Sequence, residues 1–363
     1  MNTKIEAVHS TLVATIVGRF MLAHKAHVQL VETGISALKE ALAEGRAKNI
    51  RVVIVLGSAF HARTPKNPFT WVERKNMLLA ALSPADRELV DFVPVRDYHD
   101  DARWARVVHR QVTAMVGADA HIQVFGHYKD ATSAYLDDCF RQWEVVQVSS
   151  LGDLDATTLR AMLFTGEDDD VTLSALEEYV PLGIRQYLKV WMQKPCYASL
   201  REEFAVLREE KRKYGSGPFV AGDSICRTKH HVLLIRRKNH PGRRLLAVPG
   251  GFLESSRRET PRQCAEREGR EETQLGVLKS TLDASLVSSE VFAHPDRSVR
   301  GNVISHAFYY DFDCETCPEV KAADDAMEAI WVPISDLRAM EDQFYDDHFL
   351  VLDHFLHIMG EDE

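Results

Sequence analysis

The chain has 363 residues, of which 45% are hydrophobic, and this length is sufficient for two domains that each bury a core. Its formal net charge of −10 argues against general binding to nucleic acid or to anionic membranes, although local basic pockets for a phosphate substrate stay open. No apolar run reaches membrane-spanning length, and the first twenty residues lack a basic segment followed by an apolar one. We therefore expect a cytoplasmic protein without a membrane span.

The first half of the chain alternates short apolar runs with helical patterns. The apolar runs occupy residues 12–18, 51–57, 89–95, 121–126 and 143–148, and the helical patterns occupy residues 27–44, 71–82 and 101–116. This alternation predicts βαβ units and hence an α/β domain with a doubly wound parallel sheet, covered by helices on both faces. Short helices are expected near 157–164 and 173–179, with the acidic run 167–170 as a solvated loop between them.

The first predicted strand runs directly into the sequence GRFMLAHKAH, residues 18–27. In an open α/β sheet, ligands bind beyond the carboxyl ends of the strands, where a glycine such as Gly18 lets backbone amides approach phosphate. His24 and His27 lie three residues apart on one face of the following helix, where they could donate hydrogen bonds to a triphosphate and stabilise charge in nucleotidyl transfer. Paired surface histidines without such a role are also common.

This stretch resembles the G-R-F-x-P-x-H-x-G-H motif of the nicotinamide mononucleotide adenylyltransferases, with Leu22 in place of the proline and Ala26 in place of the second glycine. The segment DATTLR, residues 155–160, resembles a second motif of that family, S/T-x-x-R at a helix start. The resemblance implies catalytic roles for His24, His27 and Arg160. It also implies that ATP or the mononucleotide is bound by Gly18, Arg19, Phe20 and Thr157, with Thr157 and Arg160 holding the β- and γ-phosphates.

Three further stretches, residues 67–78, 101–108 and 126–136, resemble the bacterial branch in which this adenylyltransferase is fused to a Nudix hydrolase domain. By that resemblance Trp104 stacks on the nicotinamide ring. Four more residues would lie near nucleotide: Arg74, His127, Lys129 and Asp130. The alternatives are ordinary packing for Trp104, a surface cation for Arg74 and a core histidine for His127.

The second half contains the acidic stretch GGFLESSRRETPRQCAEREGREETQL, residues 250–275. Residues 260–263 predict a helix start, with threonine as N-cap, proline at the first position and glutamine closing a capping box. Glu268, Glu271 and Glu272 then stand at i, i+3 and i+4, so their carboxylates project from one face and could share Mg²⁺ or Mn²⁺. A solvated acidic helix is the alternative.

This arrangement resembles the signature of the Nudix hydrolases, in which a glycine, a glutamate and R-E-x-x-E-E bind divalent metal against a diphosphate. The matching positions are Gly251, Glu259, Arg267, Glu268, Glu271 and Glu272. The chain departs from the family by a seven-residue rather than five-residue spacing before Glu259, by Gly269 in place of a large aliphatic residue and by Gln274 in place of glycine. Gly269 should cost the helix about 1 kcal/mol relative to alanine, unless it forms a small packing face with Ala265.

The strand and helix patterns around this motif predict an α+β domain after the break GSGP at 215–218. We expect a nucleotidyltransferase domain over 1–185, a helical linker over 186–215 and a Nudix domain over 216–363. In the second domain Arg297 and Arg300 resemble contacts for a diphosphate or ribose, although a basic loop before a strand is often only a solvated turn.

The two resemblances cover nearly the whole chain and imply a bifunctional enzyme. The first domain would join ATP and nicotinamide mononucleotide into NAD and pyrophosphate, and the second would cleave ADP-ribose to AMP and ribose 5-phosphate. Glu268, Glu271 and Glu272 would be both catalytic and metal-binding, with Mg²⁺ as the expected metal and Mn²⁺ as the alternative. The group that accepts a proton from water is open between a glutamate of the motif and Glu290.

Other functions stay open at this point. The Nudix domain could act on another nucleoside diphosphate derivative or only sense ADP-ribose, and the first domain could adenylylate a different phosphorylated substrate. The preference for amidated or acid mononucleotide, a homo-oligomeric state and communication between the sites are not determined by the sequence. Cys314 and Cys317 form a lone CxxC, which is half of a zinc or redox site or simply a surface turn with reduced thiols.

Overall fold

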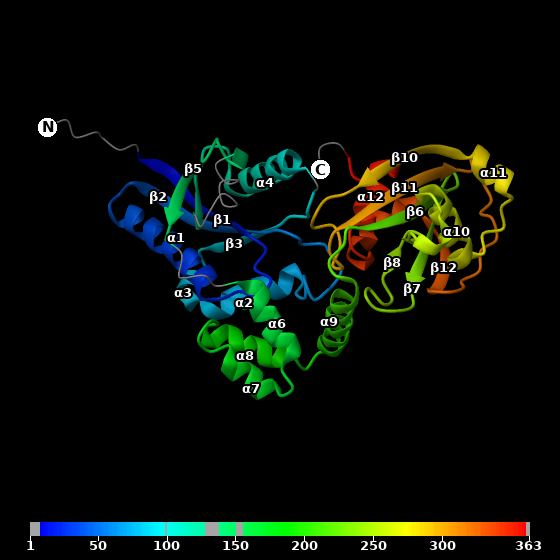
Figure 1. Cartoon of the computed structure of the whole chain (residues 1–363). Coiled ribbons are helices and arrows are strands. Elements are labelled where there is room, and N and C mark those ends of the chain that lie inside the picture. The colour runs from blue at the N-terminus through cyan, green and yellow to red at the C-terminus, as the bar shows by residue number, and fades with distance from the viewer. Residues whose placement is uncertain (1–7, 99, 128–137, 150–154, 361–363) are drawn as a thin grey trace. The chain divides into compact units, whose positions relative to one another are not determined.

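The computed structural model describes residues 8–98, 100–127, 138–149 and 155–360 and divides into two compact units (Figure 1). The first unit comprises Met1–Phe60 and Pro65–Ser199, and the second comprises His61–Thr64 and Leu200–Glu363. The division at Ser199 falls inside a helix. The domain boundaries inferred from the sequence, at residues 185 and 215, remain a prediction.

The sheet of the first unit is parallel throughout, as its sequence pattern predicts. Within the described residues it has five strands in the order β3-β2-β1-β4-β5. Their bounds are β1 His9–Gly18, β2 Ala47–Leu56, β3 Val90–Pro94, β4 His121–His127 and β5 Glu144–Val148. The order reverses beside β1, and the carboxyl ends of β1 and β4 therefore form the position where such sheets bind ligands.

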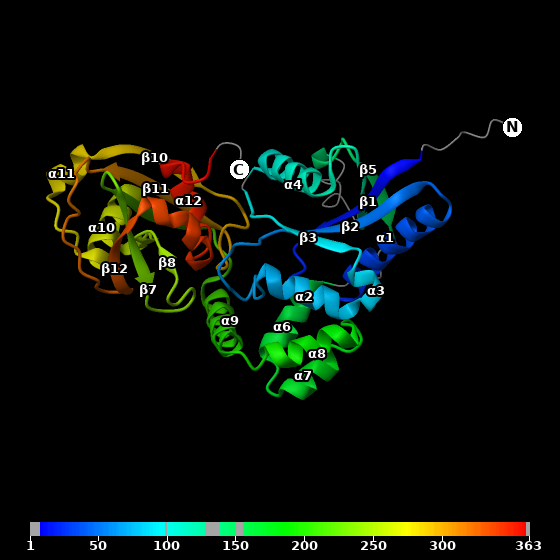
Figure 2. The same ribbon diagram turned by 180° about the vertical axis from the view of Figure 1, so that it is seen from behind.

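Helices cover both faces of this sheet, because successive residues of a buried strand point to opposite sides. Val13 packs in a core with Val107 and Val108 of the helix α4, whereas a side chain at Gly34 of the helix α1 would meet Ala14 on the other face. Figure 2 shows α4 on one side of the sheet and α1 and α2 on the other. The bounds are α1 Lys25–Ala43, α2 Trp71–Ala81, α3 Pro84–Arg87 and α4 Asp101–Val116. The predicted doubly wound α/β domain is confirmed.

Within residues 155–214, which the structure describes, four helices follow this sheet: α6 Ala156–Thr165, α7 Asp169–Ala175, α8 Leu182–Trp191 and α9 Pro195–Tyr214. The prediction that residues 167–170 form a solvated loop is wrong for the last two of them. Asp168 caps α7 by accepting a hydrogen bond from the amide of Val171 at 2.9 Å, so the acidic run begins a helix. Acidic residues in a first helical turn are favoured by the helix dipole.

The second unit is built on a mixed sheet with the order β10-β11-β6-β7-β12 in its described part, where β8 pairs with β7 and β9 with β6. The strands are β6 Phe219–Arg227, β7 His231–Arg237, β8 Leu246–Ala247, β9 Gly250–Phe252, β10 Leu286–Phe292, β11 Val303–Asp311 and β12 Ala326–Pro333. The helices are η2 Ser255–Arg257, α10 Pro261–Thr273, α11 Lys279–Ala284, η3 Ile334–Gln343 and α12 His348–Leu356. The expected α+β class is confirmed.

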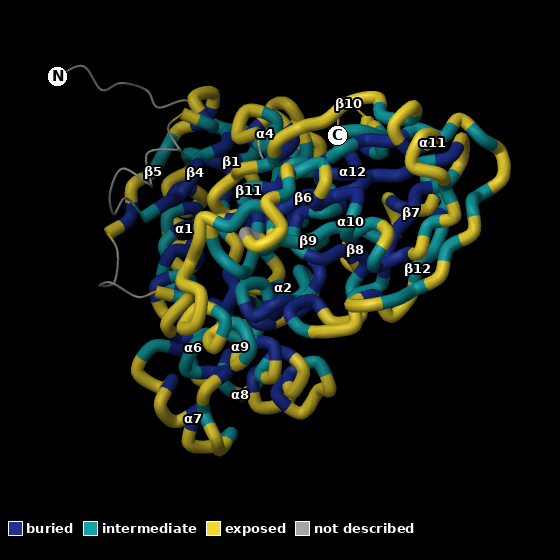
Figure 3. The backbone as a smooth tube through the Cα atoms, turned by 45° about the vertical axis from the view of Figure 1, so that its right-hand side comes forward, coloured by how far each residue is buried: buried dark blue, intermediate teal, exposed yellow. Residues whose placement is uncertain are grey.

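The helix α10 packs closely against the central strand β6. A Cβ atom at Gly222 of β6 would lie 2.4 Å from the carbonyl oxygen of Pro261 and 2.8 Å from the amide nitrogen of Ala265, so only glycine permits this approach. The buried backbone in Figure 3 follows the central strands of both sheets.

None of the helices within the described residues is long and apolar enough to cross a membrane.

Candidate active sites

The first site lies where β1 ends and α1 begins. His24 is the N-cap of α1 and His27 is in its first turn, and their rings stack with centroids 3.8 Å apart. The backbone amide of His24 donates to Nδ1 of His27 at 3.4 Å, and the ring of Phe20 meets His27 edge-on at 4.9 Å. The two predicted histidines therefore stand together at the positive end of a helix, at the end of the loop that begins after Gly18.

Arg160 of α6 joins the two predicted motifs of this unit. Its Nη1 donates to the carbonyl oxygen of Met21 at 2.9 Å, across 139 residues of sequence, and its Nη2 donates to the hydroxyl of Thr157 at 3.2 Å. Burial lowers the pKa of Arg160 to about 10, and the neighbouring charge of Arg19 adds to this shift. Two guanidinium groups held near each other favour an anion such as phosphate.

Arg74 lies inside the protein rather than at its surface. Its guanidinium is fully buried and donates to three main-chain carbonyls, those of Arg19, Gly57 at 2.7 Å and Ser58 at 3.1 Å. Burial lowers its pKa to about 10. The alternative of a surface cation is thus wrong, and the contacts show Arg74 tying together the loops that follow β1 and β2. Sequence reasoning missed Asp97, which accepts from the amide and hydroxyl of Ser58 at 3.1 and 2.5 Å.

The other residues of this unit that the sequence predicts near nucleotide are Trp104, His127, Lys129 and Asp130. Trp104 is partly buried against the core and meets the ring of Phe140 edge-on at 5.7 Å. The ring nitrogens of His127 lie 3.0 Å from the carbonyl oxygen of Val148 and 3.1 Å from that of Ala26, so this side chain connects the end of β4 to α1. Lys129 and Asp130 lie outside the described residues. The roles of all four in binding nucleotide stay predictions.

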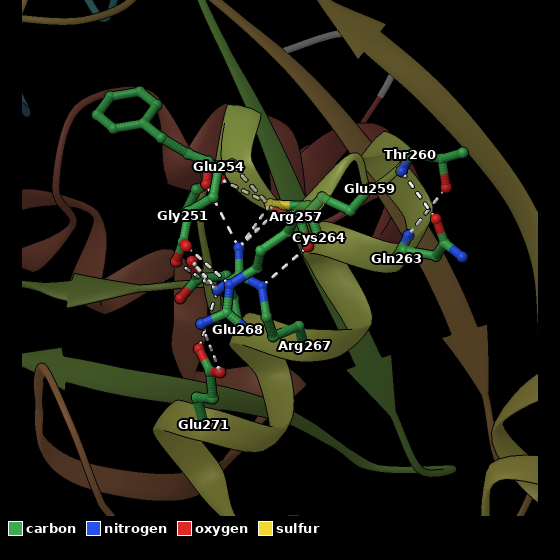
Figure 4. A network of polar contacts seen from close by, with 11 residues as sticks. Gly251, Glu254, Arg257, Glu259, Thr260, Gln263, Cys264, Arg267, Glu268 and Glu271 are labelled. Atoms are coloured by element: carbon green, nitrogen blue, oxygen red, sulfur yellow. Dashed lines mark hydrogen bonds and ion pairs between the residues drawn. The ribbon is translucent and has the colours of Figure 1, made fainter.

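The second site is organised by Arg267 of α10 (Figure 4). Its Nε and Nη2 donate to both carboxylate oxygens of Glu259 at 2.9 and 2.7 Å, and its Nη1 donates to Glu268 at 2.7 Å and to Glu271 at 2.9 Å. The hydrogen bonds from Arg267 hold the pKa of Glu259 at about 2. One cation thus gathers three carboxylates that would otherwise repel one another.

Glu272 is the buried member of this acidic group. It is 4% exposed, and its Oε2 accepts a hydrogen bond from the amide of Gly250 at 3.0 Å. Burial raises its pKa to about 8, with further repulsion from Glu268. A Cβ atom at Gly251 would lie 2.4 Å from Oε1 of Glu268, so the absence of a side chain there makes room for that carboxylate.

These residues fit a divalent cation by their chemistry. A buried carboxylate with a raised pKa lacks sufficient positive charge around it, and oxygen ligands suit Mg²⁺ and Mn²⁺. In the described part of the chain, no three His, Cys, Asp or Glu side chains are already grouped as ligands for one ion. Arg267 holds Glu268 and Glu271 instead, so metal binding would require at least one of these carboxylates to turn toward Glu272.

The three departures from the Nudix signature have local explanations. The longer loop before Glu259 forms the short helix η2, and the amide of Glu254 donates to Glu259 at 3.1 Å. Gln274 ends α10 with φ of 44°, in the left-handed region that glycine adopts most readily. Gly269 faces Ser224 of β6, whose hydroxyl donates to the carbonyl of Ala265 at 2.8 Å. The proposed small packing face of Gly269 and Ala265 is therefore present.

A cavity opens beside the glycines of β9. It is lined by Asp223, Arg237, Phe252, Arg297, Arg300 and Tyr345, among others. Both predicted arginines reach it, but both already have partners: Arg297 is buried in a bidentate ion pair with Asp347 at 2.8 and 2.9 Å, and Arg300 pairs with Glu210 at 3.2 Å.

Sequence reasoning missed other residues of this cavity, among them Arg237, Asp223 and Tyr345. Arg237 ends the apolar run of β7, and Asp223 is the one acid in β6, which are signals that could have indicated them. Tyr345 gave no comparable signal. Glu290 lies on the exposed strand β10, where its carboxylate accepts a hydrogen bond from the amide of Val291 at 3.0 Å.

The CxxC pair does not form a joint site. Cys314 donates to the carbonyl of Thr316 at 3.2 Å, and Sγ of Cys317 lies 3.9 Å from the hydroxyl of Thr228. Both are free thiols.

Comparison with known proteins identifies both units. Residues 220–355 match the NUDIX domain model. Over 189 residues the chain is 31% identical to the nicotinamide/nicotinic acid mononucleotide adenylyltransferase of Acinetobacter baylyi, which covers 52% of this chain and 90% of the relative. The chain belongs to the nicotinamide mononucleotide adenylyltransferase family. It carries a Nudix domain in addition, so both resemblances seen in the sequence are confirmed.

Members with both domains have been solved. A crystal structure of a bifunctional NMN adenylyltransferase/ADP ribose pyrophosphatase from Francisella tularensis matches with a TM-score of 0.82 and 29% identity, covering 95% of this chain and 98% of that one. The same bifunctional enzyme complexed with AMP and a manganese ion matches with a TM-score of 0.81. An ADP-ribose pyrophosphatase from Methanocaldococcus jannaschii is 40% identical over 121 residues, which cover 33% of this chain and 64% of the relative.

Proposed function

We propose that this family member catalyses two reactions of nicotinamide dinucleotide metabolism. Its first unit transfers the adenylyl group of ATP to nicotinamide mononucleotide, and its Nudix unit hydrolyses ADP-ribose to AMP and ribose 5-phosphate. The observation that carries the proposal is the similarity along 95% of the chain to an enzyme described by both activities. In the first unit Arg160 contacts Met21, 139 residues away, and in the second Gly250 contacts Glu272, 22 residues away, which supports both predicted sites.

In the first reaction a phosphate oxygen of the mononucleotide forms a bond to the α-phosphorus of ATP. The bond from that phosphorus to the bridging oxygen breaks, and pyrophosphate leaves with the electron pair. His24, His27 and Arg160 surround the loop after β1 and donate hydrogen bonds to the phosphates, where negative charge increases in the transition state. Arg74 keeps the loops after β1 and β2 in place for this contact.

In the second reaction water attacks one phosphorus of the diphosphate, and the other phosphate leaves. A divalent cation, which we propose to be Mg²⁺ with Mn²⁺ as a substitute, would be held by Glu268, Glu271 and Glu272 and would activate the water and neutralise the diphosphate. Arg267 orients two of these carboxylates. The proton of water passes to a glutamate of the motif or to Glu290, and E290Q separates these two cases because only the second predicts a large loss of activity.

The remaining expectations belong to the same proposal. Trp104 stacks on nicotinamide, and Lys129 and Asp130 contact nucleotide. The transfer activity resides in residues 1–185 and the hydrolase in 216–363, joined by 186–215. Six free cysteines fit the reducing conditions of the cytoplasm, and neither nucleic acid nor a membrane is needed as a partner. A homo-oligomer is compatible with both reactions.

Product analysis by chromatography tests the proposal directly. The purified chain with Mg²⁺ is incubated either with ATP and nicotinamide mononucleotide or with ADP-ribose, and each mixture is repeated with E272Q. We expect NAD from the first mixture with both proteins, and AMP from the second only with the unsubstituted chain. No NAD from the unsubstituted chain would refute the first activity, and no AMP, or equal AMP from E272Q, would refute the second.

A further inference from the structure

The helix α9 carries two carboxylates that contact the Nudix unit. Glu203 and Glu210 stand seven residues apart, which is about two helical turns, so their side chains lie on one face. Glu203 is 5% exposed, and Glu210 pairs at 3.2 Å with Arg300, which lines the cavity beside β9. Both glutamates belong to the same compact unit as the cavity, since that unit resumes at Leu200. Most of α9 is therefore part of the unit that contains this cavity.

Glu203 holds the loop between β7 and β8. Its Oε2 accepts a hydrogen bond from the buried amide of Gly242 at 3.2 Å and lies 3.1 Å from Nδ1 of His240. Among the residues that the structure describes, its other oxygen, Oε1, has no hydrogen-bond partner. Burial raises the pKa of Glu203, and the hydrogen bonds from Gly242 and His240 oppose this shift. The loop thus supplies the contacts that stabilise this buried carboxylate.

The same loop fixes two side chains of the cavity. The carbonyl oxygen of Pro241 accepts a hydrogen bond from Nε of Arg237 at 2.9 Å. A Cβ atom at Gly242 would lie 2.2 Å from the ring of Tyr345, so this ring packs directly on the glycine. The guanidinium carbon of Arg237 lies 4.3 Å from the centre of the same ring. A continuous set of contacts therefore runs from Glu203 through the loop to two side chains that line the cavity.

We propose that Glu203 is a positioning residue of the Nudix unit, which shapes the substrate cavity through its hydrogen bond with Gly242. Glu203 is absent from the described residues that line the cavity, so it acts on the substrate through the loop. Burying a carboxylate beside His240 adds little net stability, because the loss of hydration offsets the attraction. The inference rests on the proposed hydrolysis of ADP-ribose and assigns a role in it to α9, which the sequence predicts as part of a linker.

Substitutions on one helix separate positioning from folding. Glu203→Ala removes the acceptor of the Gly242 amide, whereas Glu203→Gln keeps a carbonyl oxygen at the same place along the side chain and loses only the charge. Glu209 offers a matched control, because its carboxylate is exposed and pairs with Arg212 of the same helix at 2.6 Å. E209Q therefore removes one charge from α9 at a solvent-exposed position. Thermal unfolding of each variant checks its folding.

The Michaelis constant and kcat for hydrolysis of ADP-ribose are measured on the full-length chain with Mg²⁺, and NAD synthesis is measured on the same proteins. We expect E203A to raise the Michaelis constant roughly 5- to 50-fold, because a buried amide loses its acceptor, and to change kcat less than about threefold. The split is expected because the loop acts on side chains of the cavity rather than on the carboxylates of α10. E203Q should stay within about threefold of the unsubstituted chain, and E209Q within about twofold. NAD synthesis should be unchanged in all variants.

A Michaelis constant in E203A close to that of the unsubstituted chain would overturn the role of Glu203 while leaving the proposed function standing. An equal rise in E203Q and E203A would overturn the hydrogen bond to Gly242 as the positioning contact. A joint fall of kcat, NAD synthesis and Tm in E203A would overturn the proposal in favour of a purely structural role.

If E203A does not fold, Glu203→Asp decides, because the shorter side chain keeps the charge but withdraws the oxygen from Gly242. A raised Michaelis constant in E203D supports the role, and an unchanged one overturns it. An unsubstituted chain that does not cleave ADP-ribose would overturn both proposals together.

Discussion

The substitution Gly251→Ala tests whether the close approach of Glu268 to β9 matters for hydrolysis. A Cβ atom at residue 251 would lie 2.4 Å from Oε1 and 2.5 Å from Cδ of Glu268, and real Cβ contacts are essentially never shorter than 3.0 Å. The carboxylate must therefore move by at least 0.6 Å, the difference between 3.0 and 2.4 Å. Since a displacement of about 1 Å can reduce a rate about 100-fold, we expect hydrolysis of ADP-ribose to fall roughly 10- to 100-fold.

The stability of the Nudix unit should hardly change in this variant, because the atoms displaced are the end of a flexible side chain. We expect less than about 1 kcal/mol, or a shift in Tm of about 2–4 °C. Gly269→Ala is the matched control: its Cβ would meet Ser224 at 3.4 and 3.5 Å, which is ordinary contact, and the helix should gain up to about 1 kcal/mol.

The assay measures release of AMP by both variants, with NAD synthesis by the same protein as the internal standard. A G251A variant that hydrolyses ADP-ribose at the unsubstituted rate would refute the reasoning, because the position of Glu268 would then not limit the reaction. A G251A variant that melts far below G269A would show that the displacement spreads beyond the Glu268 side chain.

Three further outcomes follow from the same geometry. R160Q should lower kcat/KM for NAD synthesis roughly 10- to 150-fold, because in the proposed reaction the guanidinium that bonds Met21 also contacts the phosphates. A value within about twofold of the unsubstituted chain would contradict this role. Burial raises the pKa of Glu272 to about 8, and the proposed metal site needs this carboxylate without its proton. The affinity of the Nudix unit for Mg²⁺, measured by calorimetry, should therefore rise up to about tenfold per pH unit from pH 6 and level off near pH 8. An affinity independent of pH would contradict a role of Glu272 as metal ligand. Burial raises the pKa of Asp223 from 3.8 to about 6, so the favourable neutral form is present below pH 3.8 and its stabilisation is lost as pH rises through 6. D223N should therefore gain about 2 kcal/mol relative to the unsubstituted chain between pH 4 and pH 7.5, measured by urea unfolding in EDTA, and parallel pH profiles would count against it.

Several features followed from the sequence because they depend on neighbours within a few residues. The capping box of Thr260 and Gln263 and the proline at the start of α10 are local, and the structure reproduces them at those positions. The parallel sheet of the first unit was predictable for a similar reason, since apolar runs alternating with helical patterns have few stable arrangements.

The strand β6 was not predicted, although it is central to the second sheet. Its sequence contains Gly222, Asp223 and Ser224, residue types that are depleted in strands. Each is explained by contacts with distant parts of the chain: Gly222 admits α10, Asp223 accepts from the hydroxyl of Ser305, and Ser224 bonds the carbonyl of Ala265. Tertiary packing overrides local preference here.

By itself, the sequence determined which chemical groups are available and which of them share a helix face, because spacing along a helix translates directly into direction. Only the tertiary structure decided which charged side chains already have a hydrogen-bond or ion-pair partner. Arg74, Arg297 and Arg237 are the same residue type, yet Arg74 donates to three carbonyls and Arg297 pairs with Asp347. For Arg237, no partner of either Nη group is found in the part of the chain that the structure describes. Their partners come from elements far away in the chain, and burial gives those contacts their strength, so no local pattern could distinguish them.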